Sequence, residues 1–441
     1  MNIAASLGRF LPGPSRRCLV VALDGIGHGE LIKAVEAGAA PTLGHFIAEG
    51  ELQAIASTHP PVSAIAWSSF MTACYSGKHG VFGFTNPQAD YSIRFTDAGD
   101  LRMPTLWERA AIDGLRSVIV NLPGTYPARR MSGSLVSGFV APDLALACHP
   151  RSLGTRLAAE GYVIDVDAAR AHSDPAGFSV HLLDVLRRRI EAMESMLDSE
   201  RWSLGILAFT EADRLNRMWF RRIGDGDGIE RETYWRWFRE VDSFVARCAA
   251  RYSNADIVVV SVTGFGPLKR FVNLDKWLQA NGYLDLGASG ALSPDSMAFS
   301  MDAGRIYVAS SDMFRSGAVP RDDVGRLVDD IAAGLAELVD PNTGRPVIAT
   351  VRKRRDADGG ASTPRPNLVC LPASGYELKS SRDRPLFSDA VFEGTHTQQD
   401  ALLLATRTTA RQGATVADAG ATVLAKLGLY HDDADGKSLL S

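Results

Sequence analysis

The chain has 441 residues, of which 46% are hydrophobic and 22% charged, and its formal net charge is −4. This length suits one large domain or two ordinary ones. The mild negative charge gives no basic footprint for nucleic acid, so we expect no nucleic-acid partner. Basic residues are dispersed except in two short runs, 187–189 and 352–355, and we expect both runs to be solvated.

The cysteines and the apolar runs bear on cellular location. Five cysteines lie far apart without CxxC spacing, which indicates reduced thiols rather than disulfides or a zinc cluster. No apolar run approaches the roughly 20 residues that span a bilayer. Residues 1–17 lack the apolar core of a signal peptide. We therefore expect a cytoplasmic protein without a membrane partner.

Strand-length apolar runs alternate with helical patterns along the chain. Such alternation predicts an α/β fold with a doubly wound, mostly parallel sheet flanked by helices. The predicted strands are 18–23, 117–121, 135–140, 204–209, 255–261 and 402–405. The predicted helices are 31–37, 43–49, 181–197, 231–251 and 417–427.

Changes in element length and polarity along the sequence also predict a division into segments. Residues 1–17 form an N-terminal arm, and 18–284 carry the α/β core pattern. Residues 285–385 have shorter elements and a polar stretch at 354–367, so we expect an inserted cap that contacts substrate. Residues 386–441 return to the core and end in a helix.

Two polar residues stand at positions where chemistry is common. Asp24 follows the first buried strand, and open α/β sheets bind their ligands at the carboxyl ends of strands. Ser63 follows two prolines at the start of a predicted helix. Its hydroxyl is either an ordinary N-cap or a nucleophile in the positive end of the helix dipole.

Motifs along nearly the whole chain, from about 18 to 440, resemble the type I phosphodiesterase/nucleotide pyrophosphatase branch of the alkaline phosphatase superfamily. Each motif is short, and their order and spacing carry the resemblance. They are ALDG at 22–25, PPVSAIAWSSFMT at 60–72, KHG at 78–80, VNLPGTYP at 120–127, SGFVAPD at 137–143, GFGPLKRFVNLDKWLQANGYL at 264–284, DPNTGRPV at 340–347, GTH at 394–396 and DAGATVLAKLGL at 418–429.

The resemblance implies a mechanism as well as a fold. In this family two divalent metals, usually zinc, clamp a phosphoryl group, and a hydroxyl attacks in line to form a covalent phospho-enzyme. Asp24 matches the first metal ligand and Ser63 the nucleophile. Asp213 matches the aspartate of an Asp-x-x-x-His motif, and His396 matches the histidine of Gly-Thr-His.

Three metal ligands of the family pattern are replaced in this chain. Arg217 stands four residues after Asp213 in place of histidine, and Val262 and Thr263 replace an Asp-His pair. Arginine does not deprotonate to become a ligand, and valine has no lone pair. We therefore expect no normal two-zinc centre. A single Mg²⁺, Ca²⁺ or Zn²⁺ ion on Asp24, Asp213 and His396 stays open, since hard cations accept fewer protein ligands.

Simpler interpretations of these residues also stay open. Asp24 could cap the turn that follows it. Asp213 and Arg217 have the i,i+4 spacing of a helical salt bridge, which we favour as an interpretation of that pair. His396 could be a core histidine, and Thr263 could be either filler or a substrate-binding hydroxyl.

Other residues near the matched positions could also take part. Replacement imidazoles could come from His28 or His59, whereas we expect His79 to be structural. Asp400 stands where the family usually has glycine.

Two functions remain in competition at the level of sequence. The first is a diverged enzyme acting on a phosphorylated or other anionic small molecule. Ser63 would be its nucleophile, His396 its acid/base, and Arg217, with Thr263, would bind substrate in place of a metal. The second is an inactive pseudoenzyme that binds ligands or scaffolds a protein partner. Specificity would come from the cap and from residues 85–100.

Overall fold

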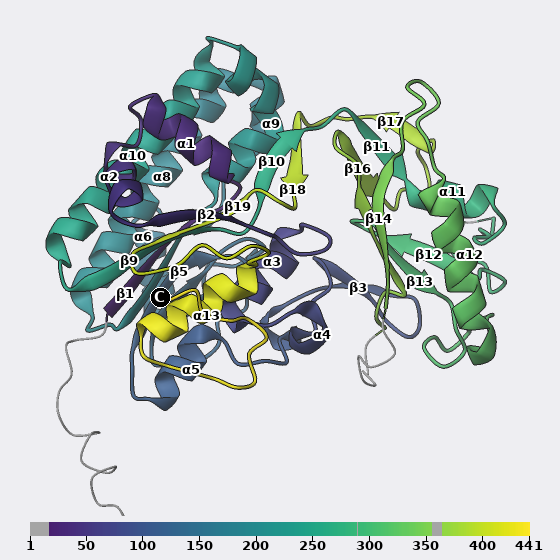
Figure 1. Ribbon diagram of the computed structural model, residues 1–441, viewed down its shortest axis with the longest axis horizontal. Helices are drawn as coiled ribbons and strands as arrows, with labels where there is room; N and C mark the ends of the chain where they lie inside the picture. Colours follow the sequence, from purple (N-terminus) through teal and green to yellow (C-terminus); the bar gives the residue numbers. More distant parts are fainter. Residues whose placement is uncertain (1–16, 289, 355–363) are drawn as a thin grey trace, which may run out of the picture.

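The computed structural model describes residues 17–288, 290–354 and 364–441. The N-terminal arm predicted at 1–17 lies almost wholly outside these residues, as does most of the polar stretch at 354–367. The described chain forms a larger lobe around a central sheet and a smaller lobe beside it (Figure 1).

An eight-stranded mixed sheet forms the centre of the larger lobe, in the order β2-β19-β9-β1-β8-β5-β6-β7. The strands from β9 to β6 are parallel, whereas β19 pairs antiparallel with β9 and β2, and β7 pairs antiparallel with β6. The α/β fold predicted from the sequence is confirmed. The strand bounds are β1 Arg17–Leu23, β2 Glu51–Ile55, β5 Ser117–Leu122, β6 Gly133–Ser137, β7 Cys148–His149, β8 Leu204–Phe209, β9 Ala255–Ser261 and β19 Ala401–Ala405.

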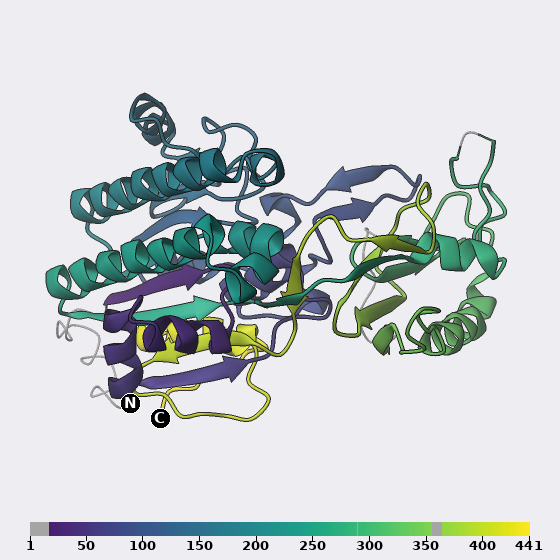
Figure 2. The same cartoon turned by 90° about the horizontal axis from the view of Figure 1, so that it is seen from above.

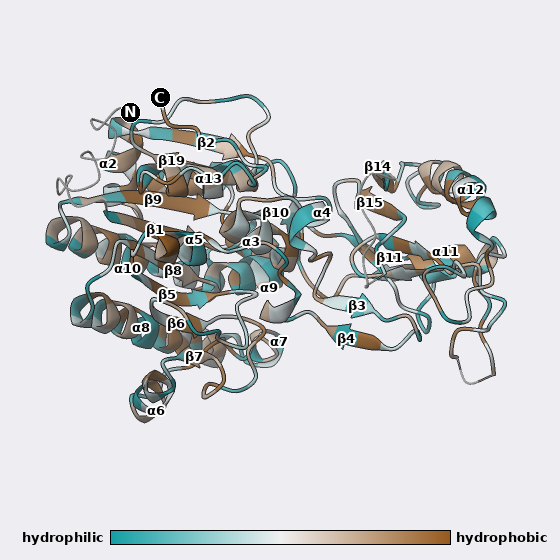
Figure 3. Ribbon diagram, turned by 90° about the horizontal axis from the view of Figure 1, so that it is seen from below, coloured by the Kyte–Doolittle hydropathy of each residue, from teal (hydrophilic) through white to brown (hydrophobic). Residues whose placement is uncertain are grey.

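Strand β1 shows how the sheet supports two cores. Alternate side chains of a strand point to opposite faces, so Leu19 and Val21 enter one cluster of buried residues while Val20 and Ala22 enter the other. Figure 3 shows the hydrophobic colouring along these central strands. Burial on both faces explains why this segment is a continuous apolar run rather than an alternating one.

Helices cover both faces of the sheet (Figure 2). One face carries α1 His28–Glu36, α2 Pro41–Glu49, α6 Arg151–Ala159, α7 Arg170–Ser173, α8 Pro175–Ser199, α9 Glu211–Asp225 and α10 Ile229–Arg251. The other carries α3 Ser63–Thr72, α5 Leu106–Ile112 and α13 Val416–Lys426. The short helix α4 Ser76–His79 follows α3, and the 3₁₀ turn Ala98–Asp100 precedes α5.

The smaller lobe has its own apolar core, which runs from Val272 to Leu378. The predicted boundary at 285 falls inside this lobe, because β11 and α11 already pack there. Strands β10 and β18, paired antiparallel, connect the lobes (Figure 1). The elements of this region are β10 Gly264–Pro267, β11 Arg270–Asn273, α11 Leu274–Ala280, β12 Ala298–Met301, β13 Arg305–Val308, the 3₁₀ turn Arg321–Asp323, α12 Val324–Ala336, β14 Ile348–Lys353, β15 Leu368–Pro372, β16 Tyr376–Lys379, β17 Phe387–Asp389 and β18 Gly394–Thr397.

A hairpin of the larger lobe reaches across to the smaller one. It consists of β3 Thr85–Pro87 and β4 Ile93–Phe95. The ring of Tyr91 at its turn stacks on Phe314, with 4.7 Å between centroids, and meets Phe299 edge-on. The hairpin therefore fixes one side of the smaller lobe against the larger. In the described parts of the chain, no helix combines the length and apolarity needed to cross a bilayer.

A buried ion pair anchors helix α9, and it corrects one expectation from the sequence. Arg189 belongs to a basic run that we expected to be solvated, but its side chain is fully buried and paired with the equally buried Glu211. Its Nη2 also donates to the carbonyl oxygen of Ile164 at 2.6 Å, and Trp237 Nε1 donates to Glu211 at 3.4 Å. The pair holds the first turn of α9 against α8.

We expect Glu211→Gln to destabilise the fold by about 3–5 kcal/mol, because it leaves the Arg189 guanidinium buried without a counter-charge. Urea unfolding measures the change. The matched control is Glu194→Gln, which removes the exposed partner of Arg247 and should cost less than about 1 kcal/mol. Equal losses in the two variants would contradict the anchoring role of Arg189–Glu211.

Candidate functional site

The candidate site lies where three neighbouring parallel strands end. Strands β9, β1 and β8 are adjacent in the sheet, and Thr263, Asp24 and Asp213 follow their carboxyl ends. Strand β10 continues from β9 and pairs with β18, where His396 lies directly opposite Phe265. The edge of the sheet and the antiparallel pair β10–β18 thus bring together residues that are up to 372 positions apart in the sequence.

Gly25 allows the turn after β1 to approach α9 closely. Its φ is +77°, and a Cβ there would lie 2.8 Å from the Cα of Asp213. Asn216 in α9 donates from Nδ2 to the Gly25 carbonyl oxygen at 2.9 Å. A side chain at position 25 would force the turn and α9 apart, so the glycine holds Asp24 beside Asp213.

Ser63 is the first residue of α3 and is buried. The N-cap position belongs to Val62, so the interpretation of Ser63 as the helix cap is wrong. Trp67 lies one turn further on the same face of the helix, and its Nε1 donates to Asp24 Oδ1 at 2.9 Å. Ser63 is therefore on the side of α3 that faces Asp24.

Asp213 is held by two partners, neither of which is Arg217. His396 Nε2 donates to its Oδ1 at 2.6 Å, and Arg214 Nη1 donates to its Oδ2 at 2.5 Å. The Asp213–Arg217 salt bridge favoured from the i,i+4 spacing is thus wrong. Arg214 also bonds Asp165 Oδ2 through Nη2 at 2.6 Å, and its guanidinium lies over a phenylalanine ring at 4.5 Å.

Arg217 points instead to the smaller lobe. Its Nη1 bonds Oε2 of Glu377 on β16 at 3.1 Å, and its guanidinium lies 5.4 Å from the ring centroid of Phe392. Burial opposes the ionisation of Glu377, but Arg217 and Lys379 outweigh it and lower the pKa of Glu377 to about 2. The ion pair therefore stays charged at neutral pH and links α9 to the smaller lobe.

The two aspartates of the site are driven to opposite protonation states. Burial, reinforced by the charge of Asp213, raises the pKa of Asp24 to about 8. Burial would also raise the pKa of Asp213, but Arg214 and His396 outweigh it and hold that pKa below its usual range. At neutral pH the site thus holds one carboxylate and one carboxylic acid, so the two acids do not repel each other.

Thr263 and Val262 are both fully buried after β9. Thr263 Oγ1 has no hydrogen-bond partner among the described residues. The ring of His396 packs edge-on against Phe265 with 4.6 Å between centroids. His396 is thus oriented by a ring on one side and by Asp213 on the other.

The remaining histidines and Asp400 lie in other surroundings. His28 begins α1, and its backbone N–H donates to the Asp400 carbonyl oxygen at 3.0 Å. His59 lines a cavity on the other side of α3. His79 is buried, accepts at Nδ1 from the Val81 N–H at 3.1 Å, and so carries its proton on Nε2, 3.0 Å from a serine hydroxyl. Burial lowers the pKa of His79 to about 3, which fits a neutral structural residue.

The residues present do not fit the family's two-metal centre. Three metal-ligand positions hold Arg217, Val262 and Thr263, none of which supplies an anionic or imidazole ligand. The Asp213 carboxylate is already bonded to the Arg214 guanidinium. Across the described residues, no group of three or more histidine, cysteine, aspartate or glutamate side chains is arranged to hold a metal ion.

Sequence reasoning missed four residues of this site. Arg214 directly follows Asp213, and adjacent residues on a helix do not face each other, so no spacing rule indicates their contact. Asp165 and Glu377 are distant in sequence. Trp67 could have been found, because it lies four residues after Ser63 on a predicted helix.

Comparison with known proteins identifies the family of this chain. The type I phosphodiesterase / nucleotide pyrophosphatase family matches residues 18–399, and the chain belongs to that family, within the alkaline phosphatase superfamily. No curated protein matches the chain.

Solved structures share its fold. Phosphonoacetate hydrolase from Sinorhizobium meliloti 1021, in complex with phosphonoformate, is 16% identical with a TM-score of 0.63 over 94% of this chain and 96% of that one. Murine ectonucleotide pyrophosphatase / phosphodiesterase 5 is 13% identical with a TM-score of 0.57 over 96% and 97%.

Double-mutant cycles test which arginine neutralises Asp213. We expect a coupling free energy of about 1–3 kcal/mol between Asp213→Asn and Arg214→Gln, because the two side chains are bonded and buried. The matched cycle with Arg217→Gln should give less than about 0.5 kcal/mol. Urea unfolding of the single and double variants supplies both values. A larger coupling to Arg217 would restore the salt bridge expected from the sequence.

Proposed function

We propose that this protein is a diverged phosphodiesterase- or phosphatase-like enzyme that acts on a phosphorylated or other anionic small molecule without the two-zinc centre. The observation that carries the proposal is the bonding of Asp213 to Arg214 and His396 beside Asp24. A guanidinium thus neutralises a carboxylate that the family uses as a metal ligand. The family assignment supports the class of reaction.

In the proposed reaction, Ser63 Oγ attacks phosphorus. An O–P bond forms as the bond to the leaving oxygen breaks, and water later hydrolyses the phosphoserine. The position of Ser63 at the N-terminus of α3 favours negative charge at its hydroxyl. His396 is the candidate acid/base, since imidazole titrates near neutrality. It would take the hydroxyl proton and protonate the leaving group.

Arginines would supply the electrostatic part of catalysis. Arg217 would bind the anionic group of the substrate with its planar fork, exchanging Glu377 for substrate oxygens, and Thr263 would contribute its unpartnered hydroxyl. A single Mg²⁺, Ca²⁺ or Zn²⁺ ion on Asp24, Asp213 and His396 would have to compete with Arg214 for Asp213. We therefore propose that Arg214 and Arg217, rather than a resident metal, balance the phosphate charge.

The class of ligand is supported by proteins of the same fold. The phosphonoacetate hydrolase structures contain phosphonoformate or phosphonoacetate, and one structure of the murine protein contains AMP. All of these are small anions. We propose a small anion as the ligand of this chain as well.

One observation favours the alternative, an inactive pseudoenzyme that binds ligands or scaffolds a protein partner. Both arginines of the site are already paired, Arg214 with Asp213 and Arg217 with Glu377. Loss of the metals removes several kcal/mol of transition-state stabilisation, and paired arginines replace only part of it. The alternative would retain the pocket without turnover.

A cytoplasmic location is part of the same proposal. All five cysteines are buried and none forms a disulfide. Free thiols are the normal state of cysteine where the cytoplasm keeps proteins reduced.

The test of activity is hydrolysis of an activated aryl phosphodiester with and without EDTA, together with metal content by mass spectrometry. We expect turnover that EDTA does not change, and a loss on the order of 100-fold or more in Ser63→Ala. The matched control is Ser68→Ala in the same helix, which loses only a hydrogen bond to the Ala64 carbonyl oxygen. Two bound zincs with EDTA-sensitive turnover would refute the proposal. No turnover, with ligand binding unchanged in Ser63→Ala, would favour the pseudoenzyme.

Restoring the family's ligands should restore zinc binding. We expect the triple variant Arg217→His, Val262→Asp, Thr263→His to bind zinc, measured by competition with a chelator. Adding Arg214→Gln should tighten binding about 10- to 100-fold, because Asp213 is then released from the guanidinium. The control keeps Arg217→His and Thr263→His but carries Val262→Asn, which lacks the anionic ligand. No zinc binding in either background would show that the frame of the site has also changed.

A further inference from the structure

A large cavity lies on the other side of helix α3 from Ser63. Its volume is about 1280 Å³, and it is lined by the segment before α3, by α3 and α4, and by β13, β14 and β15 of the smaller lobe. Figure 1 shows α4 on the side of the larger lobe that faces these strands. Since small-molecule sites commonly occupy about 300–1,000 Å³, this cavity has room for a nucleotide-sized ligand.

The lining of this cavity is strongly basic. Among the described residues, one carboxylate lines it, that of Asp435, and Lys78 pairs with that group at 2.6 Å. The cationic side chains of the lining number six and come from both lobes. They are Lys78, Arg305, Arg352, Lys353, Arg354 and Arg365. Three residues of the run that we expected to be solvated, 352–354, therefore contribute to a concave basic surface.

Arg305 adds to this lining a buried guanidinium whose hydrogen-bond donors are not all paired. Its side chain is only 1% exposed. Its Nε donates to the Asp302 carbonyl oxygen at 2.7 Å and its Nη1 to the Thr85 carbonyl oxygen at 2.8 Å. Its Nη2 has no hydrogen-bond partner among the described residues, and neither has the buried hydroxyl of Ser57 in the same lining. Buried donors without partners are costly, and both of these atoms belong to residues that line the cavity.

The absence of a side chain at Gly83 makes room for that guanidinium. A Cβ at Gly83 would lie 2.6 Å from Arg305 Cζ. The main chain before β3 therefore supports the flat face of the guanidinium, and the hydrogen bonds at Nε and Nη1 fix its orientation. Arg305 is thus held rigidly before any ligand arrives, which lowers the entropic cost of binding.

The cavity is separate from the Asp24–Asp213 centre. In α3 the residues that line it are Ile65 and Ser69, whereas Ser63 and Trp67 lie on the opposite side of the helix, since each residue turns about 100°. The state of His59 in the lining agrees with a positive environment. Burial and then the charge of Arg352 lower the pKa of His59 to about 4, so this imidazole is neutral at physiological pH.

We propose that this cavity is a second binding site, which takes a small molecule carrying a chain of linked phosphates. Guanidinium groups match phosphate oxygens in bidentate geometry, and cations from both lobes suit an anion longer than one phosphate. Lys78 and Lys353 are already paired with Asp435 and Asp329, so the fork of Arg305 is the group that an anion would meet. Binding in this cavity does not depend on turnover at Ser63, because no residue of the Asp24–Asp213 centre lines it.

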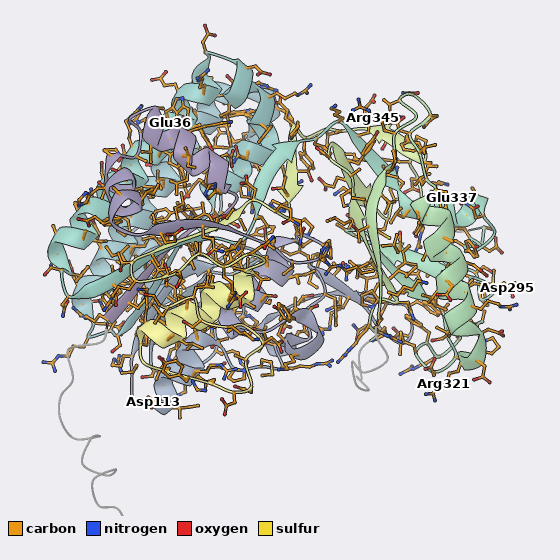
Figure 4. The ribbon with its side chains drawn as sticks, viewed as in Figure 1. Glu36, Asp113, Asp295, Arg321, Glu337 and Arg345 are labelled. Atoms are coloured by element: carbon orange, nitrogen blue, oxygen red, sulfur yellow. The ribbon has the colours of Figure 1, made fainter. Side chains whose placement is uncertain are left out.

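Isothermal titration of the full-length protein with sodium tripolyphosphate tests the site. We expect saturable binding at low salt, and a loss of about tenfold or more in affinity in Arg352→Gln/Arg354→Gln, because charge-assisted bonds are removed. The control is Arg321→Gln/Arg345→Gln, which removes the same charge from the smaller lobe at two exposed positions labelled in Figure 4. The control should change the affinity less than about twofold, since exposed distant charges are screened.

Further arms separate the alternatives. Arg217→Gln should bind tripolyphosphate as the unaltered protein does, because Arg217 does not line the cavity, and a loss there would place the anion at the Asp24–Asp213 centre and overturn the proposal. Arg305→Lys keeps the charge but loses the fork and its bonds to the Asp302 and Thr85 carbonyl oxygens, so we expect weaker binding, measured well below the melting temperature of the variant. Absence of binding, equal loss in the control, or much tighter binding of a short single-stranded oligonucleotide would each refute the proposal, the last in favour of a nucleic-acid surface.

Discussion

The charge on Asp213 is the constraint on which the site depends. A carboxylate buried at the end of a parallel sheet needs compensating positive charge, and in the two-metal members of the family that charge comes from metals. Here the Arg214 guanidinium supplies it from within the protein, and His396 hydrogen-bonds the same carboxylate. Asp24 stays neutral beside it, because burial and the charge of Asp213 raise the pKa of Asp24 to about 8. Side chains of the protein itself thus compensate the buried Asp213 carboxylate.

Helix α9 carries much of this arrangement. Glu211 in its first turn pairs with Arg189 of α8. Asp213 faces the strand ends and pairs with Arg214. Arg217, one turn after Asp213, pairs with Glu377 in the smaller lobe. Three ionic contacts within seven residues therefore define the helix in relation to the sheet, the site and the second lobe. Of these, the Arg189–Glu211 pair is the most deeply buried, so the position of Asp213 rests on the packing between α8 and α9.

Much of the fold could be predicted because buried parallel strands leave continuous apolar runs. The strands β8 and β9 have the bounds predicted from sequence, and β1 and β5 differ by one residue. Antiparallel pairing of β19 and β7 could not be predicted, since it depends on how the chain returns to the sheet.

The site was predictable only where a motif or a helical spacing applies. The contact of Arg214 with Asp213 follows no spacing rule, and Glu377 lies 160 residues from Arg217. The basic cavity could not be predicted either, because no motif or spacing rule connects its residues. Its charges come from short segments scattered between Lys78 and Arg365, each unremarkable in its own sequence context.

The pair of strands β10 and β18 has a mechanical consequence. These strands are a connection between the two lobes, and they also carry Phe265 and His396. A rotation of the smaller lobe would therefore move β18 and alter the contact of His396 with Asp213. The position of the smaller lobe and the geometry around Asp213 are in this way connected through β10 and β18.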